Sequence, residues 1–113
     1  MILINQSLKI QLQNSLLNYY CKIGELDNAR NLFDKIKNNN IFIWNTMISG
    51  LVKNNYSKEG IQLFQEMKKS NIIPNEITYI SILSACSDLK NKEFFKEIEN
   101  DINQPEFKDT ITK

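Results

Sequence analysis

The sequence predicts an all-α fold, an α-solenoid in which antiparallel helix pairs stack side by side. Apolar residues recur at positions i, i+3, i+4 and i+7 along most of the 113 residues, which is the spacing of one helix face. This pattern returns after 31 and again after 35 residues, a length that holds two helices and a turn. Only three glycines and two prolines interrupt it, as expected for helices joined by short turns.

Two separate anchors at one offset identify the internal repeat. The segment NSLL (14–17) lies 31 residues before NTMI (45–48), and LF (32–33) lies the same 31 residues before LF (63–64). A third copy of the first anchor, ISIL (80–83), follows after 35 residues. Because one helix pair cannot bury its own apolar face, the pairs are expected to stack and to form a concave surface.

The first helix of each unit is predicted from a stripe of four residues. The stripes are Gln13, Leu16, Leu17 and Tyr20 in the first unit, Trp44, Met47, Ile48 and Leu51 in the second, and Tyr79, Ile82, Leu83 and Cys86 in the third. Gly24 and Asn55 follow the first two of these helices, where a left-handed residue closes a helix. Trp44 lies on this stripe and is therefore expected to pack in the core.

The second helix has its own stripe in the first two units. Its members are Ala29, Leu32, Phe33 and Ile36, matched by Gly60, Leu63, Phe64 and Met67. The small residues Ala29 and Gly60 allow the two helices of a pair to approach closely, and Pro74 stops the second helix of its unit. The pattern fades after Asn91.

Composition excludes several classes of function. Lys and Arg number 14 and Asp and Glu 13, and this net charge of +1 argues against a protein that grips nucleic acid mainly by charge. The sequence has no histidine, and its two cysteines, Cys21 and Cys86, lie in apolar helical stretches. A zinc site and a disulfide framework are therefore unsupported, and two buried thiols are expected. No pair of acidic residues is arranged for catalysis, so neither an enzyme nor a cofactor is predicted.

The N-terminal segment MILINQSLKIQLQ predicts neither a targeting nor a membrane segment. Its apolar run of three residues is too short for a signal peptide or a membrane span. It also lacks the Arg and Ser of an organelle transit peptide. Residues 1–9 are interpreted as an N-terminal extension, either the remnant of a preceding repeat or a polar cap.

The segment WNTMISGLVKNNYSKEGIQLFQEMKKSNIIPN closely resembles a pentatricopeptide repeat in motif and length. NSLLNYYCKIGELDNARNLFDKIKNNN resembles the short variant of this repeat, and NEITYISILSACSDLKN the start of the long variant. The tetratricopeptide repeat fits less well, because its aromatic-Gly pair and strict 34-residue period are missing.

The resemblance divides the chain into a short repeat (10–40), a standard repeat (41–75) and a long repeat (76–110). The second half of the long repeat is degenerate, because Phe95 stands where the family has a small residue and Glu99 interrupts the apolar face. This succession is found in the mixed-length, PLS-type subclass, and it implies a tetratricopeptide-like superhelix. Members of the family generally carry many more repeats, so the resemblance implies a fragment or an unusually short member.

Pentatricopeptide proteins bind single-stranded RNA at roughly one base per repeat. The resemblance implies the same partner here, without catalysis, in the processing or editing of organellar RNA. It implies no membrane and no small-molecule substrate, and it leaves protein partners open. A mitochondrion or plastid is the implied location, although no transit peptide is visible. Nothing resembles the His and Cys pattern of the deaminase domain that some members carry.

By resemblance, the fifth residue and the last residue of a repeat choose the base. These are Asn14 with Asn40 in the first repeat and Asn45 with Asn75 in the second. An Asn amide offers both a donor and an acceptor, and an Asn at the fifth position goes with C or U in the family. Ile80 takes this position in the third repeat, where no base choice is expected.

Two further sets of positions are implied by the resemblance. The second residue of each repeat flanks the base, which corresponds to Gln11, Phe42 and Ile77, and Phe42 could stack on it. A lysine near the end of the first helix approaches a phosphate, which corresponds to Lys22 and Lys53, whereas the third repeat has Asp88.

The same residues also allow structural interpretations. An Asn at the start of a helix is often its cap, Phe42 could seal the seam between repeats, and Lys22 and Lys53 could lie on a solvated face. The alternative function is a helical-repeat scaffold that binds a protein partner on the same surface without binding RNA.

Overall fold

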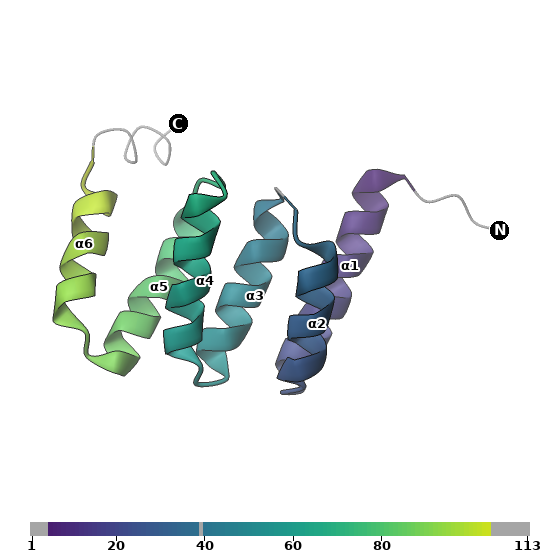
Figure 1. Cartoon of the computed structure of the whole chain (residues 1–113), viewed down its shortest axis with the longest axis horizontal. Coiled ribbons are helices and arrows are strands. Elements are labelled where there is room, and N and C mark those ends of the chain that lie inside the picture. The colour runs from purple at the N-terminus through teal and green to yellow at the C-terminus, as the bar shows by residue number, and fades with distance from the viewer. Residues whose placement is uncertain (1–4, 39, 105–113) are drawn as a thin grey trace.

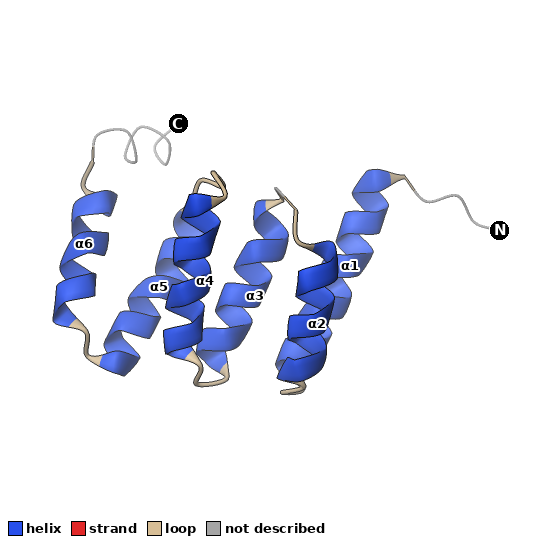
Figure 2. Cartoon of the chain, in the orientation of Figure 1, coloured by secondary structure: helices blue, strands red, loops and turns tan. Residues whose placement is uncertain are grey.

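The computed structural model describes residues 5–38 and 40–104, and all regular structure in these ranges is helical (Figure 2). The six helices are α1 (Gln6–Lys22), α2 (Leu26–Ile36), α3 (Ile41–Lys53), α4 (Ser57–Lys69), α5 (Glu76–Leu89) and α6 (Lys92–Ile102). They form three antiparallel pairs that follow one another in chain order across the molecule (Figure 1). The predicted all-α fold of stacked helix pairs is confirmed.

The helices pack in two layers. In the first layer α3 lies between α1 and α5 and contacts both. In the second layer α2 packs on α1 and α3, α4 packs on α3 and α5, and α6 packs on α5. Each helix pair therefore covers part of the next pair, as expected for a solenoid.

Asparagine side chains cap the first helix of each pair. The Oδ1 atoms of Asn5 and Asn40 accept backbone N–H groups in the first turns of α1 and α3, at 2.8 and 2.9 Å. Asn75 forms a capping box with Thr78 at the start of α5. These caps satisfy N–H groups that have no partner inside the helix.

The first helix of the chain is longer than its equivalents. α3 and α5 begin at Ile41 and Glu76, the residues at which the second and third repeats were expected to begin. α1 begins at Gln6, so residues 6–9, which the sequence interpretation assigned to an extension, form its first turn. The masked residues of that extension and residues 105–110 of the third repeat lie outside the described residues.

Left-handed residues end the helices as predicted. Gly24 has φ +79° and Asn55 has φ +72°, so both adopt the predicted conformation. Lys90 takes this role after α5 with φ +53°, and Asn71 takes it after α4 with φ +62°. An Asn tolerates this conformation better than a Lys does, because its short polar side chain can hydrogen-bond locally.

The core follows the predicted stripes. Every stripe residue except Leu16 is buried or partly buried. Trp44 is 3% exposed and packs edge-on against Phe33, with ring centroids 5.1 Å apart. Its Nε1 donates a hydrogen bond to the Asn38 carbonyl oxygen at 2.7 Å, so the one polar atom of the buried indole is satisfied. The prediction that Trp44 is a core residue is confirmed.

The prediction for Leu16 is wrong, because this side chain is 43% exposed. It belongs to an apolar stripe on the outer face of α1 that consists of Leu8, Leu12, Leu16, Tyr19 and Ile23. The equivalents of Leu16 on α3 and α5, Met47 and Ile82, are 2% and 0% exposed. The preceding helix pair covers that face of α3 and α5, whereas no described residue covers it on α1.

The last helix is held by fewer apolar side chains. Ile98 is the buried residue of α6, and Phe94 packs edge-on against Phe64 with ring centroids 6.3 Å apart. Phe95 is 42% exposed and Glu99 is exposed, in agreement with the weak apolar pattern predicted after Asn91.

Ion pairs connect the helices of the second layer. Arg30 donates from Nε and Nη2 to the two carboxylate oxygens of Glu59, both at 2.8 Å, which joins α2 to α4. The pairs Lys37–Glu66 and Lys68–Asp101, each at 3.2 Å, join α2 to α4 and α4 to α6. All these groups are partly exposed, so each pair is expected to stabilise the fold by at most about 1 kcal/mol.

Gly50 brings α1 and α3 into close contact, which the sequence analysis did not anticipate. A Cβ added at Gly50 would lie 2.7 Å from Cys21 Cβ and still closer to Cys21 Sγ. The predicted close contact at Gly60 is looser, because an added Cβ there would meet the terminal Cγ2 of Val52 at 2.9 Å. The α1–α3 spacing therefore depends on the missing side chain at Gly50.

We expect the Gly50→Ala variant to be less stable than the wild type by about 1–2 kcal/mol in urea denaturation. Alanine gains about 1 kcal/mol of helix propensity over glycine, but the overlap with the Cβ of Cys21 forces two helices apart at a cost of roughly 1–3 kcal/mol. Gly60→Ala is the matched control, since the Val52 methyl can rotate away, and this variant should stay within about 0.5 kcal/mol of the wild type. Equal stability of both variants would contradict the close contact.

Candidate nucleic-acid interface

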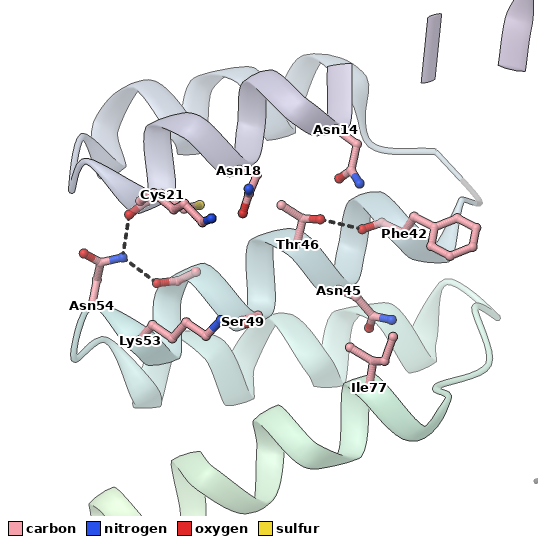
Figure 3. A pocket seen from close by; sticks show the side chains of 12 residues that line it. Asn14, Asn18, Cys21, Phe42, Asn45, Thr46, Ser49, Lys53, Asn54 and Ile77 are labelled. Atoms are coloured by element: carbon pink, nitrogen blue, oxygen red, sulfur yellow. Dashed lines mark hydrogen bonds between the residues drawn. The ribbon is translucent and has the colours of Figure 1, made fainter. Parts of the chain in front are cut away.

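A groove of about 430 Å³ opens on the layer formed by α1, α3 and α5 (Figure 3). Its lining is mostly polar and comes mainly from α1 and α3. The lining residues are Asn14, Asn18, Cys21, Lys22, Phe42, Asn45, Thr46, Ser49, Gly50, Lys53, Asn54 and Ile77. The ion pairs of the second layer contribute no residue to this lining.

Six of the nine residues assigned from the sequence line this groove. They are Asn14, Lys22, Phe42, Asn45, Lys53 and Ile77. Asn40 and Asn75 lie outside the lining and cap α3 and α5, and Gln11 is an exposed residue of α1 outside the lining. The periodicity of the first helices thus brings residues 31 positions apart in the sequence to one surface.

Asn45 and Asn75 are in direct contact. The Nδ2 atom of Asn45 donates to the Oδ1 atom of Asn75 at 3.0 Å, and Asn45 is only 6% exposed. The Oδ1 atom of Asn45 accepts from the Thr78 hydroxyl at 2.6 Å. Thr78 was missed in the sequence analysis, although the spacing of Asn75 and Thr78 is that of a capping box.

Asn14 and Asn40 do not reproduce this contact. The Asn14 Oδ1 atom is buried and has no hydrogen-bond partner among the described residues. The Asn40 Oδ1 atom accepts from the backbone N–H groups of Phe42 and Ile43 at 2.9 and 3.4 Å. The two predicted Asn pairs therefore differ in structure: one is hydrogen-bonded, and the other leaves an acceptor open at the groove.

Two large apolar side chains stand exposed beside the asparagines. Phe42 is 59% exposed and Ile77 is 52% exposed, and both line the groove. This exposure means that most of the Phe42 ring is not buried in a seam between helix pairs. An exposed aromatic ring is a surface on which a planar base can stack.

The two lysines of the groove carry its positive charge. Lys22 and Lys53 lie in the last turns of α1 and α3, and neither takes part in an ion pair of the described residues. A lysine in the last turn also interacts favourably with the helix dipole, so both can stabilise their helices. Asp88, the equivalent position in α5, accepts a hydrogen bond from the Ser57 hydroxyl at 2.9 Å.

Asn54 closes one end of the groove, a role that the sequence analysis did not assign. Its Nδ2 atom donates to the carbonyl oxygens of Cys21 at 2.9 Å and of Gly50 at 2.7 Å (Figure 3). These bonds connect the C-terminal ends of α1 and α3, whose last carbonyl groups have no partner inside their own helices.

The chemistry of the lining favours binding. Its titratable side chains are one thiol and two ammonium groups, and burial raises the pKa of the Cys21 thiol, so it is protonated at neutral pH. The two cysteines are free and buried, as predicted. In the part of the chain that the structure describes, no cluster of His, Cys, Asp or Glu could hold a metal ion. No helix in the described ranges is both long enough and apolar enough to cross a membrane.

Three relatives from Arabidopsis thaliana illustrate what this chain is similar to. A mitochondrial pentatricopeptide repeat-containing protein is 46% identical over 76 residues, or 67% of this chain and 12% of the relative. A chloroplastic pentatricopeptide repeat-containing protein is 41% identical over 80 residues, or 71% of this chain and 11% of the relative. Another pentatricopeptide repeat-containing protein is 36% identical over 97 residues, or 86% of this chain and 12% of the relative. The chain thus spans about a tenth of the length of these curated relatives.

Family models match the part of the chain that forms the groove. The model described as the PPR repeat family matches residues 39–88, and the model described as the PPR repeat matches residues 14–41. Together they include α3, α4 and nearly all of α5, as well as most of α1 and all of α2. On this evidence the chain belongs to the pentatricopeptide repeat (PPR) family.

Proposed function

We propose that this chain is a non-catalytic module that binds single-stranded RNA in the groove between α1, α3 and α5. The observation that carries the proposal is the convergence of unpaired lysines, exposed Phe42 and polar amides on one surface of a PPR chain. The repeats of this family read one base each with two or three side chains. The groove offers the corresponding groups: cations for phosphates, an aromatic face for stacking and amides for base edges.

The finer assignments are also part of this proposal. Asn14 with Asn40 and Asn45 with Asn75 select pyrimidines, Gln11, Phe42 and Ile77 flank the bases, and Lys22 and Lys53 contact phosphates. The repeats span 10–40, 41–75 and 76–110, in the short, standard and long order of the PLS-type subclass. Because similar proteins are named mitochondrial or chloroplastic, we propose an organelle as the site of action, in RNA processing or editing.

Titration with short single strands tests base selection. We expect U4 and C4 to bind more tightly than A4 at low salt, and Asn45→Ala to weaken the pyrimidine complexes by roughly fivefold, the value of about one hydrogen bond. Chemical-shift changes in the ¹⁵N NMR spectrum measure the affinity and identify the surface. Equal affinity for all three strands, or shifts outside the groove, would rule the proposal out.

Salt dependence tests the two lysines. With two phosphate contacts, log K against log salt concentration should have a slope of about −1.4 for a single strand, and Lys22→Gln and Lys53→Gln should each reduce its size by about 0.7. Lys35→Gln is the matched control, because Lys35 lies on α2 in the other layer and should leave the slope unchanged. A slope that is the same in all three variants would contradict the phosphate contacts.

The alternative function, a protein-interaction scaffold, is favoured by the apolar stripe on α1. Gly50, the equivalent of Tyr19 in this stripe, packs against α1, so the stripe has the character of a face that receives another helix pair. If this surface rather than the groove is functional, Leu12→Glu should abolish association with a helical-repeat partner in analytical ultracentrifugation, and Asn45→Ala should not. RNA binding that is lost with Asn45→Ala and retained with Leu12→Glu supports the groove instead.

A further inference from the structure

The two Asn pairs belong to two equivalent junctions between helix pairs. The first junction consists of Asn14, Asn40 and Ile43, and the second of Asn45, Asn75 and Thr78. Asn40 and Ile43 each lie 35 residues before their counterparts Asn75 and Thr78, and Asn14 lies 31 residues before Asn45. The chain therefore contains its own comparison, in which the main chemical difference is Ile43 in one junction and Thr78 in the other.

At the second junction, backbone groups determine which way the Asn45 amide points. The backbone N–H of Thr78 donates to Asn75 Oδ1 at 3.2 Å, so this atom is an acceptor. The Asn45 atom that faces it at 3.0 Å must then be the donor Nδ2. This leaves Asn45 Oδ1 facing the Thr78 hydroxyl, which donates to it at 2.6 Å. The hydroxyl oxygen in turn accepts the backbone N–H of Asn75 at 3.1 Å.

The capping box of α5 thus holds the Asn45 amide in one orientation. Rotating the amide by half a turn would place its Oδ1 against the Oδ1 of Asn75, two acceptors with no proton between them. Thr78 is 0% exposed and Asn45 6%, so water cannot readily replace the lost bonds. An amide has two N–H groups and two lone pairs, so Asn45 still has one of each to offer a base.

The first junction lacks this device. Ile43 has no hydroxyl group, and the Asn40 Oδ1 atom is used by two backbone N–H groups at the start of α3. The Asn14 Oδ1 atom is buried without a partner in the described part of the chain. Nothing in this junction distinguishes the two orientations of the Asn14 amide by hydrogen bonding.

We propose that Thr78 is a specificity-determining positioning residue, which fixes the order of donor and acceptor that Asn45 presents and makes the second junction distinguish U from C. The first junction accepts both, because Asn14 can turn its amide to match either base. The proposal rests on the proposed function, since it concerns the same groove. Its chemical basis is that uracil presents N3–H beside carbonyl oxygens, whereas cytosine presents N3 as an acceptor beside an amino donor, so the order is reversed.

The orientation itself can be tested without RNA. In ¹⁵N-labelled full-length chain, the side-chain N–H of Asn45 that donates to Asn75 should exchange with solvent more slowly than the side-chain N–H groups of Asn14. Thr78→Val keeps the shape but removes the hydroxyl, and it should bring the exchange of Asn45 to the level of Asn14. Thr78→Ser keeps the hydroxyl and should retain the slow exchange. Slow exchange that persists in Thr78→Val would overturn the proposed orientation.

The selectivity is then measured at each junction separately. Asn14→Ala leaves Asn45 as the reading amide, and in this background the dissociation constants for U4 and C4 should differ by roughly five- to tenfold. Adding Thr78→Val should reduce the difference to within about twofold, and adding Thr78→Ser should not. In the Asn45→Ala background, which leaves Asn14, the two strands should bind within about twofold of each other.

The outcomes separate this proposal from the proposed function. If U4 and C4 bind no better than A4 in any variant, the proposed function fails, and the exchange experiment alone decides the orientation of Asn45. If the pyrimidine strands bind and Thr78→Val keeps the full difference between U4 and C4 while remaining folded, the role of Thr78 is overturned and RNA binding stands. Loss of selectivity without loss of pyrimidine binding is the result that supports it, because a merely destabilised variant would lose both strands equally.

Discussion

α3 has apolar side chains on three of its sides, and its partner in the helix pair can cover only one of them. α1 and α2 cover a second side and α5 a third, and Trp44, Met47, Ile48 and Leu51 become 0–3% exposed as a result. Burial of each such side chain is worth about 1.5–3 kcal/mol, while the net stability of a whole domain is only about 5–15 kcal/mol. The fold therefore depends on contacts between neighbouring pairs, and the contact at Gly50 determines how closely the first two approach.

The groove lies on the side of α3 that remains uncovered. Phe42, Asn45, Ser49 and Lys53 recur every three or four residues along this helix, so one stripe carries the aromatic ring, the amide, the hydroxyl and the cation. The stripe is held on a helix whose opposite faces are fully packed. A surface that rests on a rigid helix loses little conformational freedom when a ligand binds, which favours recognition at low cost.

The distribution of charge matters more here than its total. Arg30, Lys37 and Lys68 are paired with carboxylates on the second layer, whereas Lys22 and Lys53 remain unpaired at the groove. A chain with a net charge of +1 can therefore still present a locally basic face. Two lysines provide only a weak salt-dependent attraction, so hydrogen bonding and stacking would account for most of the selectivity.

The sequence by itself determined the number and the order of the helix pairs, most of the core, the left-handed residues Gly24 and Asn55 and six of the twelve residues that line the groove. These features follow from local spacing, because helical periodicity assigns a residue to a face without any knowledge of what lies opposite. The exposure of Leu16 depends on which helix covers α1, and the need for Gly50 depends on how near Cys21 comes.

The difference between Asn14 and Asn45 was likewise decided by the tertiary structure alone. Both residues occupy the same place in the repeat, yet one meets Ile43 across the junction and the other meets Thr78. Whether an amide is free or hydrogen-bonded depends on atoms about 30 residues away in the sequence and about 3 Å away in space. A pattern of residue types along the chain does not contain that distance.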